Sequence, residues 1–139
     1  MVSDAQKAAI KESWSGVDLN TAGIAFYNQL EQKAPDVYAV FKLGPGAKTN
    51  PKTAAQGLKV MSFIDQCVQG IDDMGAVAGK LDTLASRHPG YGAKKAHFPP
   101  AGPCLLDALA EVSGHWSGGA RDAWAAFYEV ISQHMTAPL

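Results

Sequence analysis

Apolar residues recur every three or four positions along most of the chain, which is the spacing of one face of an α-helix. The first pattern predicts a helix over roughly residues 4–16. Ser3, just before this helix, and Gln6, in its first turn, have the spacing of a capping box. In that motif each side chain bonds the backbone N–H of the other residue. The apolar members of this first pattern are Ile10, Trp14 and Val17.

Proline bounds the next two predicted helices. The second pattern stops at Pro35, where a short new turn can begin because proline suits a first helical position. Residues 42–48 contain glycine and proline and predict an irregular connection. Asn50 and Pro51 then form a strong helix start, since an N-capping side chain precedes a proline. The second pattern consists of Gly23, Phe26, Tyr27, Leu30 and Ala34.

The helix after Pro51 has an apolar face that begins with one strongly polar residue, Gln56. This position has two interpretations, which the pattern alone does not separate. Either the face meets a group that needs a hydrogen bond at that end, or Gln56 is a partly exposed side chain at the rim of a core. The rest of the face consists of Val60, Ile64, Cys67, Val68 and Ile71.

The following helical pattern ends in a histidine. Leu84 and His88 are four residues apart, so on a helix they present an apolar contact and an imidazole to the same object. Pro89 disfavours helical backbone at His88, which therefore stands where the helix gives way to a turn. A single histidine of this kind is more often a packed or solvated residue than a metal ligand. Val77, Leu81 and Ala85 complete the pattern.

Two more helices are expected, and no strand pattern occurs. One covers Leu105 to Trp116 and should begin late or be kinked, because Pro99, Pro100 and Pro103 precede or enter it. The last runs from Ala120 to His134. About six substantial helices with short connections predict an all-α protein, organised as one domain over residues 1–139.

Composition and charge narrow the classes of function. A chain of 139 residues can bury a core without metal or disulfide links, and a net charge of −1 gives no electrostatic case for binding nucleic acid. No apolar run reaches the length of a membrane span, and the start lacks a basic region followed by an apolar one. We therefore expect a cytoplasmic protein with no membrane partner, in which Cys67 and Cys104 are free buried thiols.

Four motifs stand in order along the chain: Trp14, Pro35 with Phe41, Gln56 with Val60, and Leu84 with His88. Their order and approximate spacing resemble the globin family, and the likeness extends over essentially the whole chain. Residues 2–7, 87–92 and 121–126 are most similar to single-domain globins of annelid worms. The resemblance implies the globin fold, with six to seven helices around one haem pocket. Gln56 follows Phe41 by only 15 positions, which suggests that the small fourth helix is absent.

The resemblance also implies a role for each matching residue. His88 would be the proximal ligand, binding the iron of a non-covalent haem b through Nε2. Gln56 falls where many globins carry a distal histidine. Tyr27, eight residues before Pro35, falls where the second helix faces the distal pocket. The other residues expected to contact haem are Phe41, Lys59, Val60, Leu84, Tyr91, Ala93 and Phe98.

The function implied is reversible oxygen binding for storage or transport, as in haemoglobins and myoglobins, with no catalytic step. Oxygen on ferrous haem develops negative charge on its outer atom, and Tyr27 and Gln56 could each donate a hydrogen bond to it. At about 1 kcal/mol or more each, two such bonds would raise oxygen affinity roughly ten- to a hundredfold. The alternative for Tyr27 is a core tyrosine whose hydroxyl bonds a backbone carbonyl.

The second hypothesis is a haem enzyme, either a nitric-oxide dioxygenase or a weak peroxidase. Gln56 cannot accept and return a proton near neutral pH as a histidine could, which counts against a dedicated peroxidase. Nitric-oxide dioxygenation needs only an oxygenated haem and a means of reducing the iron again. The expected partners are dioxygen, carbon monoxide and nitric oxide, bound by a monomer or small homo-oligomer.

Overall fold

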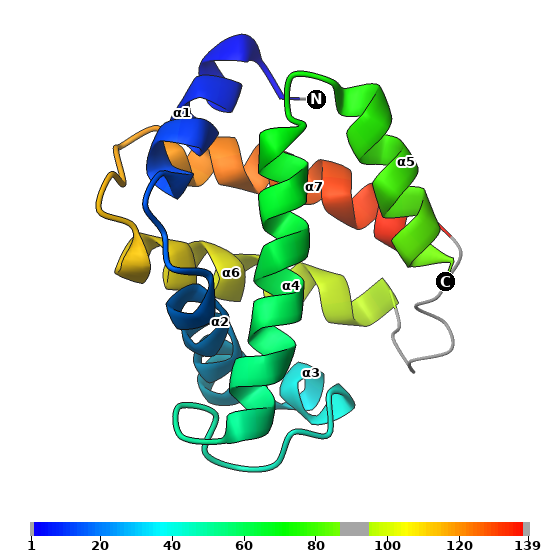
Figure 1. Cartoon of the computed structure of the whole chain (residues 1–139). Coiled ribbons are helices and arrows are strands. Elements are labelled where there is room, and N and C mark those ends of the chain that lie inside the picture. Colours follow the sequence, from blue (N-terminus) through cyan, green and yellow to red (C-terminus); the bar gives the residue numbers. More distant parts are fainter. Residues whose placement is uncertain (1, 87–94, 138–139) are drawn as a thin grey trace.

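Helices make up the regular structure of residues 2–86 and 95–137, which are the residues that the computed structural model describes (Figure 1). No strand occurs in these two ranges, and no helix lies between α3 and α4, which confirms the all-α class and the missing small helix. The elements are α1 (Asp4–Trp14), α2 (Leu19–Lys33), α3 (Pro35–Val40), α4 (Pro51–Gln69), α5 (Met74–Ala85), the 3₁₀-helix η2 (Lys95–His97), α6 (Phe98–Val112) and α7 (Ala120–Thr136).

Side-chain caps explain where several helices begin. Ser3 and Gln6 form the predicted capping box before α1, and the Asn50 side chain accepts the backbone N–H of Lys52 before α4. Helix α1 ends two residues earlier than expected, because Ser15 leaves the helical backbone with a ψ of 126° and Gly16 then takes a φ of 75°.

The expectation of a late start for α6 was wrong. The helix begins at Phe98, and Pro99 and Pro100 occupy its first turn, where a backbone N–H has no helical acceptor in any case. Pro103 lies inside the helix, and Trp116 lies beyond its end at Val112. Pro99 and Pro100 therefore remove no helical hydrogen bond, whereas Pro103 lies beyond the first turn.

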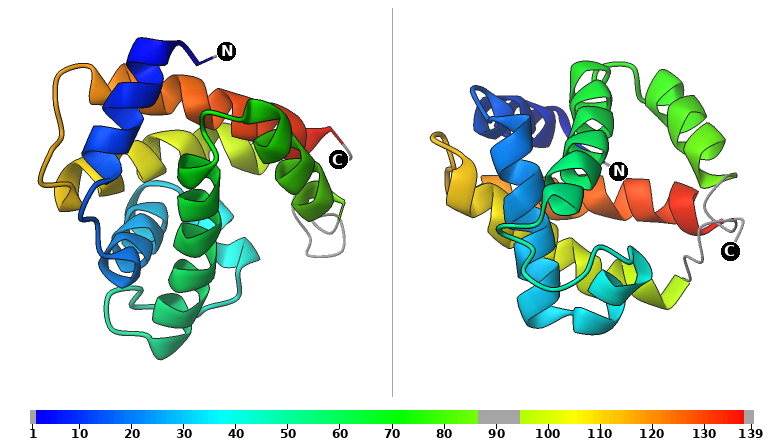
Figure 2. Two further views of the ribbon diagram at one scale, coloured as in Figure 1. Left: turned by 45° about the horizontal axis from the view of Figure 1, so that its top comes forward. Right: turned by 60° about the horizontal axis from the view of Figure 1, so that its bottom comes forward.

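Helices α2 and α4 cross with their backbones in contact. A Cβ atom built on Gly23 would lie 2.5 Å from the carbonyl carbon of Gly57, and one built on Gly57 would lie 2.7 Å from that of Gly23. No side chain fits at either position, so the two glycines fix where these helices cross. Helix α2 also packs against α6, while α1 and α5 pack mainly against α7 (Figures 1 and 2).

A paired polar cluster joins α1 to α7 inside the core. The indole Nε1 of Trp124 donates to the hydroxyl of Ser13 at 2.8 Å, and that hydroxyl donates to the carbonyl of Ala9 at 2.8 Å. Trp14 packs against Trp124 with ring centroids 5.6 Å apart, and its own Nε1 donates to Asp65 on α4 at 2.8 Å. Every polar atom of these buried side chains therefore has a partner.

Helix α5 rests on α7 through side chains. Val77, Leu81 and Ala85 are buried, and Nδ1 of His134 lies 2.8 Å from a carboxylate oxygen of Asp82. Figure 1 shows α5 beside α7, on the side away from α2. Cys67 and Cys104 are free buried thiols, as predicted. Over the described ranges, no helix has both the length and the apolar character needed to span a membrane.

Candidate functional site

Tyr27 is a fully buried tyrosine whose hydroxyl has no hydrogen-bond partner among the described residues. It lies on α2, one turn after the Gly23 crossing, and Phe41 meets its ring edge-on with centroids 4.9 Å apart. The bond to a backbone carbonyl that a core tyrosine would make is not formed. Tyr38 makes such a bond, donating to the carbonyl of Gly44 at 2.6 Å. An unpaired buried donor costs about 1–3 kcal/mol, so Tyr27 needs an explanation.

Gln56 is the polar side chain that acts on this hydroxyl. Burial raises the pKa of Tyr27 well above its usual range, and the nearby Gln56 side chain lowers it by a smaller amount. No hydrogen bond of ordinary geometry joins the two groups. Because the phenol stays protonated at neutral pH, Tyr27 is available as a donor. The Gln56 side chain therefore lies near the Tyr27 hydroxyl, and the distal role that the family resemblance implies for the two residues stays a prediction.

Phe41 adds an aromatic surface to this site. It follows α3 directly and is 36% exposed. Leu58 is the one other exposed large hydrophobic residue in the described ranges. The Phe41 ring contacts the ring of buried Tyr27, so a partly exposed aromatic side chain lies directly beside that residue. A flat apolar group placed there would cover Phe41.

The other residues expected to contact haem differ in burial. Val60 on α4, Leu84 on α5 and Phe98 at the start of α6 are half-buried against the core, while Lys59 is exposed. Helix α5 ends at Ala85, three residues before His88. His88, Tyr91 and Ala93 lie outside the described residues. Within residues 2–86 and 95–137 no cluster of three histidine, cysteine or acidic side chains could hold a metal ion.

Thr53 is a buried polar residue that sequence reasoning missed. It lies on α4, four residues before Gly57, with no exposed surface, and its hydroxyl has no partner in the described part of the chain. Its spacing from Gln56 and Gly57 places it on the same helix face. That spacing was visible in the sequence, but threonine at a helix start is so common that the pattern alone gave no reason to single it out.

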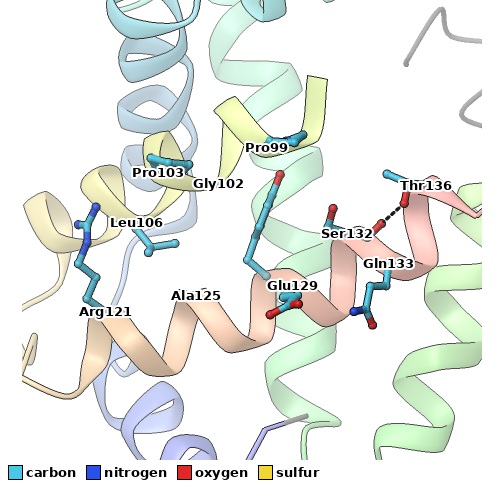
Figure 3. A pocket seen from close by; sticks show the side chains of 11 residues that line it. Pro99, Gly102, Pro103, Leu106, Arg121, Ala125, Glu129, Ser132, Gln133 and Thr136 are labelled. Atoms are coloured by element: carbon cyan, nitrogen blue, oxygen red, sulfur yellow. Dashed lines mark hydrogen bonds between the residues drawn. The ribbon is translucent and has the colours of Figure 1, made fainter. Parts of the chain in front are cut away.

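A groove of about 370 Å³ between α6 and α7 has a different character (Figure 3). Its lining includes Pro99, Arg121 and Tyr128, but none of the predicted site residues. The hydroxyl of Tyr128 donates to the carbonyl of Phe98 at 2.6 Å. Unlike the surroundings of Tyr27, this groove presents no unpaired buried side chain in the described ranges.

Comparisons with known proteins give related sequences and structures of the same fold. A sequence profile of the globin family matches residues 24–135. Globin polymeric component P2 of Glycera dibranchiata is 32% identical over 142 positions, covering 96% of this chain and 95% of that protein. A flavohemoprotein of Bacillus thuringiensis is 28% identical over 117 positions, which cover 84% of this chain but 27% of that protein. The deoxy haemoglobin of Dasyatis akajei has the same fold, with a TM-score of 0.85 at 18% identity, covering 100% of this chain and 99% of that one.

Proposed function

Because the chain belongs to the globin family, we propose that it binds haem b non-covalently and uses it to bind dioxygen reversibly, for storage or transport. Haem supplies an iron atom that can take up dioxygen, carbon monoxide or nitric oxide. The observation that carries the proposal is the hydroxyl of Tyr27, which is fully buried and unpaired in the described part of the protein. A donor kept in this state fits a site that receives its acceptor from outside the chain.

The apolar residues of the site fit a flat hydrophobic cofactor. Phe41 is partly exposed beside Tyr27, and Val60, Leu84 and Phe98 are half-buried on three different helices. We assign His88 as the iron ligand, and Tyr91, Ala93 and Lys59 as further contacts at the haem edge. These assignments follow the family pattern.

Two donors on the distal side would hold dioxygen tightly. The phenol of Tyr27 and the amide of Gln56 each contribute about 1 kcal/mol or more when water is excluded. Because about 1.4 kcal/mol corresponds to a tenfold change in an equilibrium constant, we expect slow oxygen release. Carbon monoxide accepts hydrogen bonds weakly and gains much less from either donor.

A haem enzyme is the second candidate. The likeness to a flavohemoprotein over 84% of this chain favours it, since related sequences occur within larger proteins. Of the two reactions, nitric-oxide dioxygenation fits these residues better than peroxidase activity, because Gln56 cannot act as a proton acceptor and donor near neutral pH. Such an enzyme would need an electron donor that reduces the iron after each turnover.

The absorption spectrum of the haem-loaded protein tests the proposal first. After reduction by dithionite and desalting, we expect a five-coordinate ferrous spectrum that becomes an oxygenated one lasting for hours in air. His88→Gly should lose iron coordination, and added imidazole should restore it. Rapid oxidation to the ferric form would favour the enzyme instead, and a missing Soret band in haem-replete protein would end the assignment of His88.

The role of Tyr27 has a matched control. Tyr27→Phe should speed oxygen dissociation about tenfold, because the loss of one hydrogen bond of this kind changes an equilibrium by about that factor. Tyr38→Phe removes a hydroxyl that already bonds the Gly44 carbonyl, so oxygen dissociation should stay unchanged. Stopped-flow measurement of oxygen release would show the difference. Equal rates for both variants and the parent would contradict the distal role of Tyr27.

We also propose an intracellular location and a monomeric or small homo-oligomeric state. Two buried cysteines that remain free thiols support a reducing compartment. The Glycera relative is named as a polymeric component, so larger assemblies are worth testing by light scattering.

A further inference from the structure

Two buried side-chain oxygens lack a hydrogen-bond partner in the described part of the protein, and both lie close to the α2–α4 crossing. They are the hydroxyls of Tyr27 and Thr53, and neither residue has exposed surface. Tyr27 follows Gly23 by four residues on α2, and Thr53 precedes Gly57 by four residues on α4. Each is therefore about 6 Å along its helix from the backbone contact.

Gln56 lies on the same helix face as Thr53, and its side chain affects the Tyr27 hydroxyl. It is three residues after Thr53, and residues three apart are neighbours on a helix surface. Long side chains in helices also point back toward the preceding turn, which for Gln56 is the turn that carries Thr53. At its other end the Gln56 side chain lies close enough to the Tyr27 hydroxyl to lower its pKa.

Counting donors and acceptors gives Thr53 a role. The amide of Gln56 has an NH₂ group that donates and an oxygen that accepts. If Tyr27 and the Gln56 NH₂ both donate to the bound ligand, the Gln56 Oε1 atom still needs a donor. Thr53 carries the one other buried hydroxyl without a partner in the described residues.

We propose that Thr53 is a positioning residue of the ligand site. Its hydroxyl, unpaired in this structure, donates to Oε1 of Gln56 when ligand is bound and keeps the amide NH₂ turned toward the ligand. This inference rests on the proposed oxygen-binding function. Without the Thr53 hydroxyl, the amide can rotate by half a turn and present its oxygen to the ligand. An acceptor facing another acceptor repels it, so Thr53 decides whether Gln56 holds or destabilises dioxygen.

Oxygen dissociation from the haem-loaded full chain tests the proposal. Thr53→Val keeps the shape but removes the hydroxyl, and should speed oxygen release about two- to tenfold, as expected for the loss of up to one hydrogen bond. Thr53→Ser should restore the parent rate, and carbon monoxide release should change little. Thr21→Val, an exposed threonine on α2, is the matched control and should leave both rates unchanged.

Combining Thr53→Val with Gln56→Leu distinguishes a positioning role of Thr53 from a packing role. In a Gln56→Leu background, Thr53→Val should have no further effect on oxygen release, because no amide remains to be oriented. The infrared band of bound carbon monoxide should be single in the parent and split in Thr53→Val, with one band for each amide orientation. An equal Thr53→Val effect in both backgrounds, or an unsplit band, would overturn the proposal.

Thermal unfolding of the carbon monoxide-bound protein gives a readout that does not depend on ligand release rates. If Thr53 bonds Gln56, Thr53→Val lowers the unfolding midpoint, and its effect shrinks in the Gln56→Leu background. A hydroxyl with no partner would instead give a higher midpoint when removed. If Tyr27→Phe and Gln56→Leu speed oxygen release while Thr53→Val is silent, only this inference fails. If all three are silent, the proposed distal site fails with it.

Discussion

Two buried pairs of polar side chains differ in whether their polar atoms are hydrogen-bonded. Between α1 and α7, Ser13 and Trp124 are both buried, and the indole donates to the hydroxyl at 2.8 Å. Near the α2–α4 crossing, Thr53 and Tyr27 are buried as completely, yet neither hydroxyl has a partner in the described part of the chain. Each pair combines a small hydroxyl residue with a large aromatic one.

The first pair is a structural hydrogen-bond network, whereas the second pair leaves hydroxyls available to another group. A satisfied buried network stabilises one packing of the helices, whereas an unpaired buried hydroxyl is unfavourable unless something completes it. In this protein the unpaired groups lie beside a close backbone contact between α2 and α4, where Gly23 meets Gly57. The chain therefore holds its unpaired donors on a rigid support.

Breaking that support should give the largest effect. Gly23→Ala places a Cβ atom 2.5 Å from the backbone of Gly57, which cannot move aside, so the free energy of unfolding should fall by about 3 kcal/mol or more. Gly79→Ala on α5 is the control, because a Cβ there meets nothing within 4 Å. Alanine should raise the stability of that helix by about 0.5–1 kcal/mol. Urea unfolding measures both changes, and losses of equal size would contradict the contact at the crossing.

The paired hydroxyl should matter more to stability than the unpaired one. Ser13→Ala leaves the Trp124 N–H buried without an acceptor and should lower the free energy of unfolding by about 2 kcal/mol. Thr53→Val removes no protein hydrogen bond present in the structure, so any loss of unfolding free energy should be less than half as large. Exposed Ser15→Ala should stay within about 0.5 kcal/mol. A larger loss for Thr53→Val than for Ser13→Ala in urea unfolding would reverse the comparison.

Exposed charges should contribute least. Asp107 on α6 accepts from Lys33 at 2.7 Å and from Arg121 at 3.0 Å, and the Lys33 ammonium, followed by Arg121, holds the pKa of this carboxyl below its usual range. Because the folded pKa is the lower one, the stabilisation is present above about pH 4 and is lost as pH falls through the folded value. Asp107→Asn should cost about 0.5–1 kcal/mol at pH 7, and this difference should shrink toward zero as the pH falls through the lowered folded pKa of Asp107. Urea unfolding at several pH values would show a constant difference if the pairing did not matter.

Local sequence signals determined where most helices begin and which faces are buried. The Ser3–Gln6 capping box and the Asn50–Pro51 helix start act within one turn of backbone, so a reader of the sequence can find them without knowing the fold. The late start expected for α6 failed because proline removes only an N–H that the first helical turn does not use. The residues of the distal site, Tyr27 and Gln56, came from the family pattern, and their roles remain predictions.

Only the tertiary structure decided which polar groups have partners. Whether a hydroxyl is satisfied depends on atoms that are distant in sequence, such as the Ser13 oxygen that receives the Trp124 N–H from 111 residues away. The local sequence does not show that the hydroxyl of Tyr27 is unpaired while that of Tyr38 is paired. The periodicity of the chain fixed the helices, because backbone hydrogen bonds are local. The packing of α2 on α4 left two hydroxyls unpaired, because side-chain partners are set by the three-dimensional arrangement of the helices.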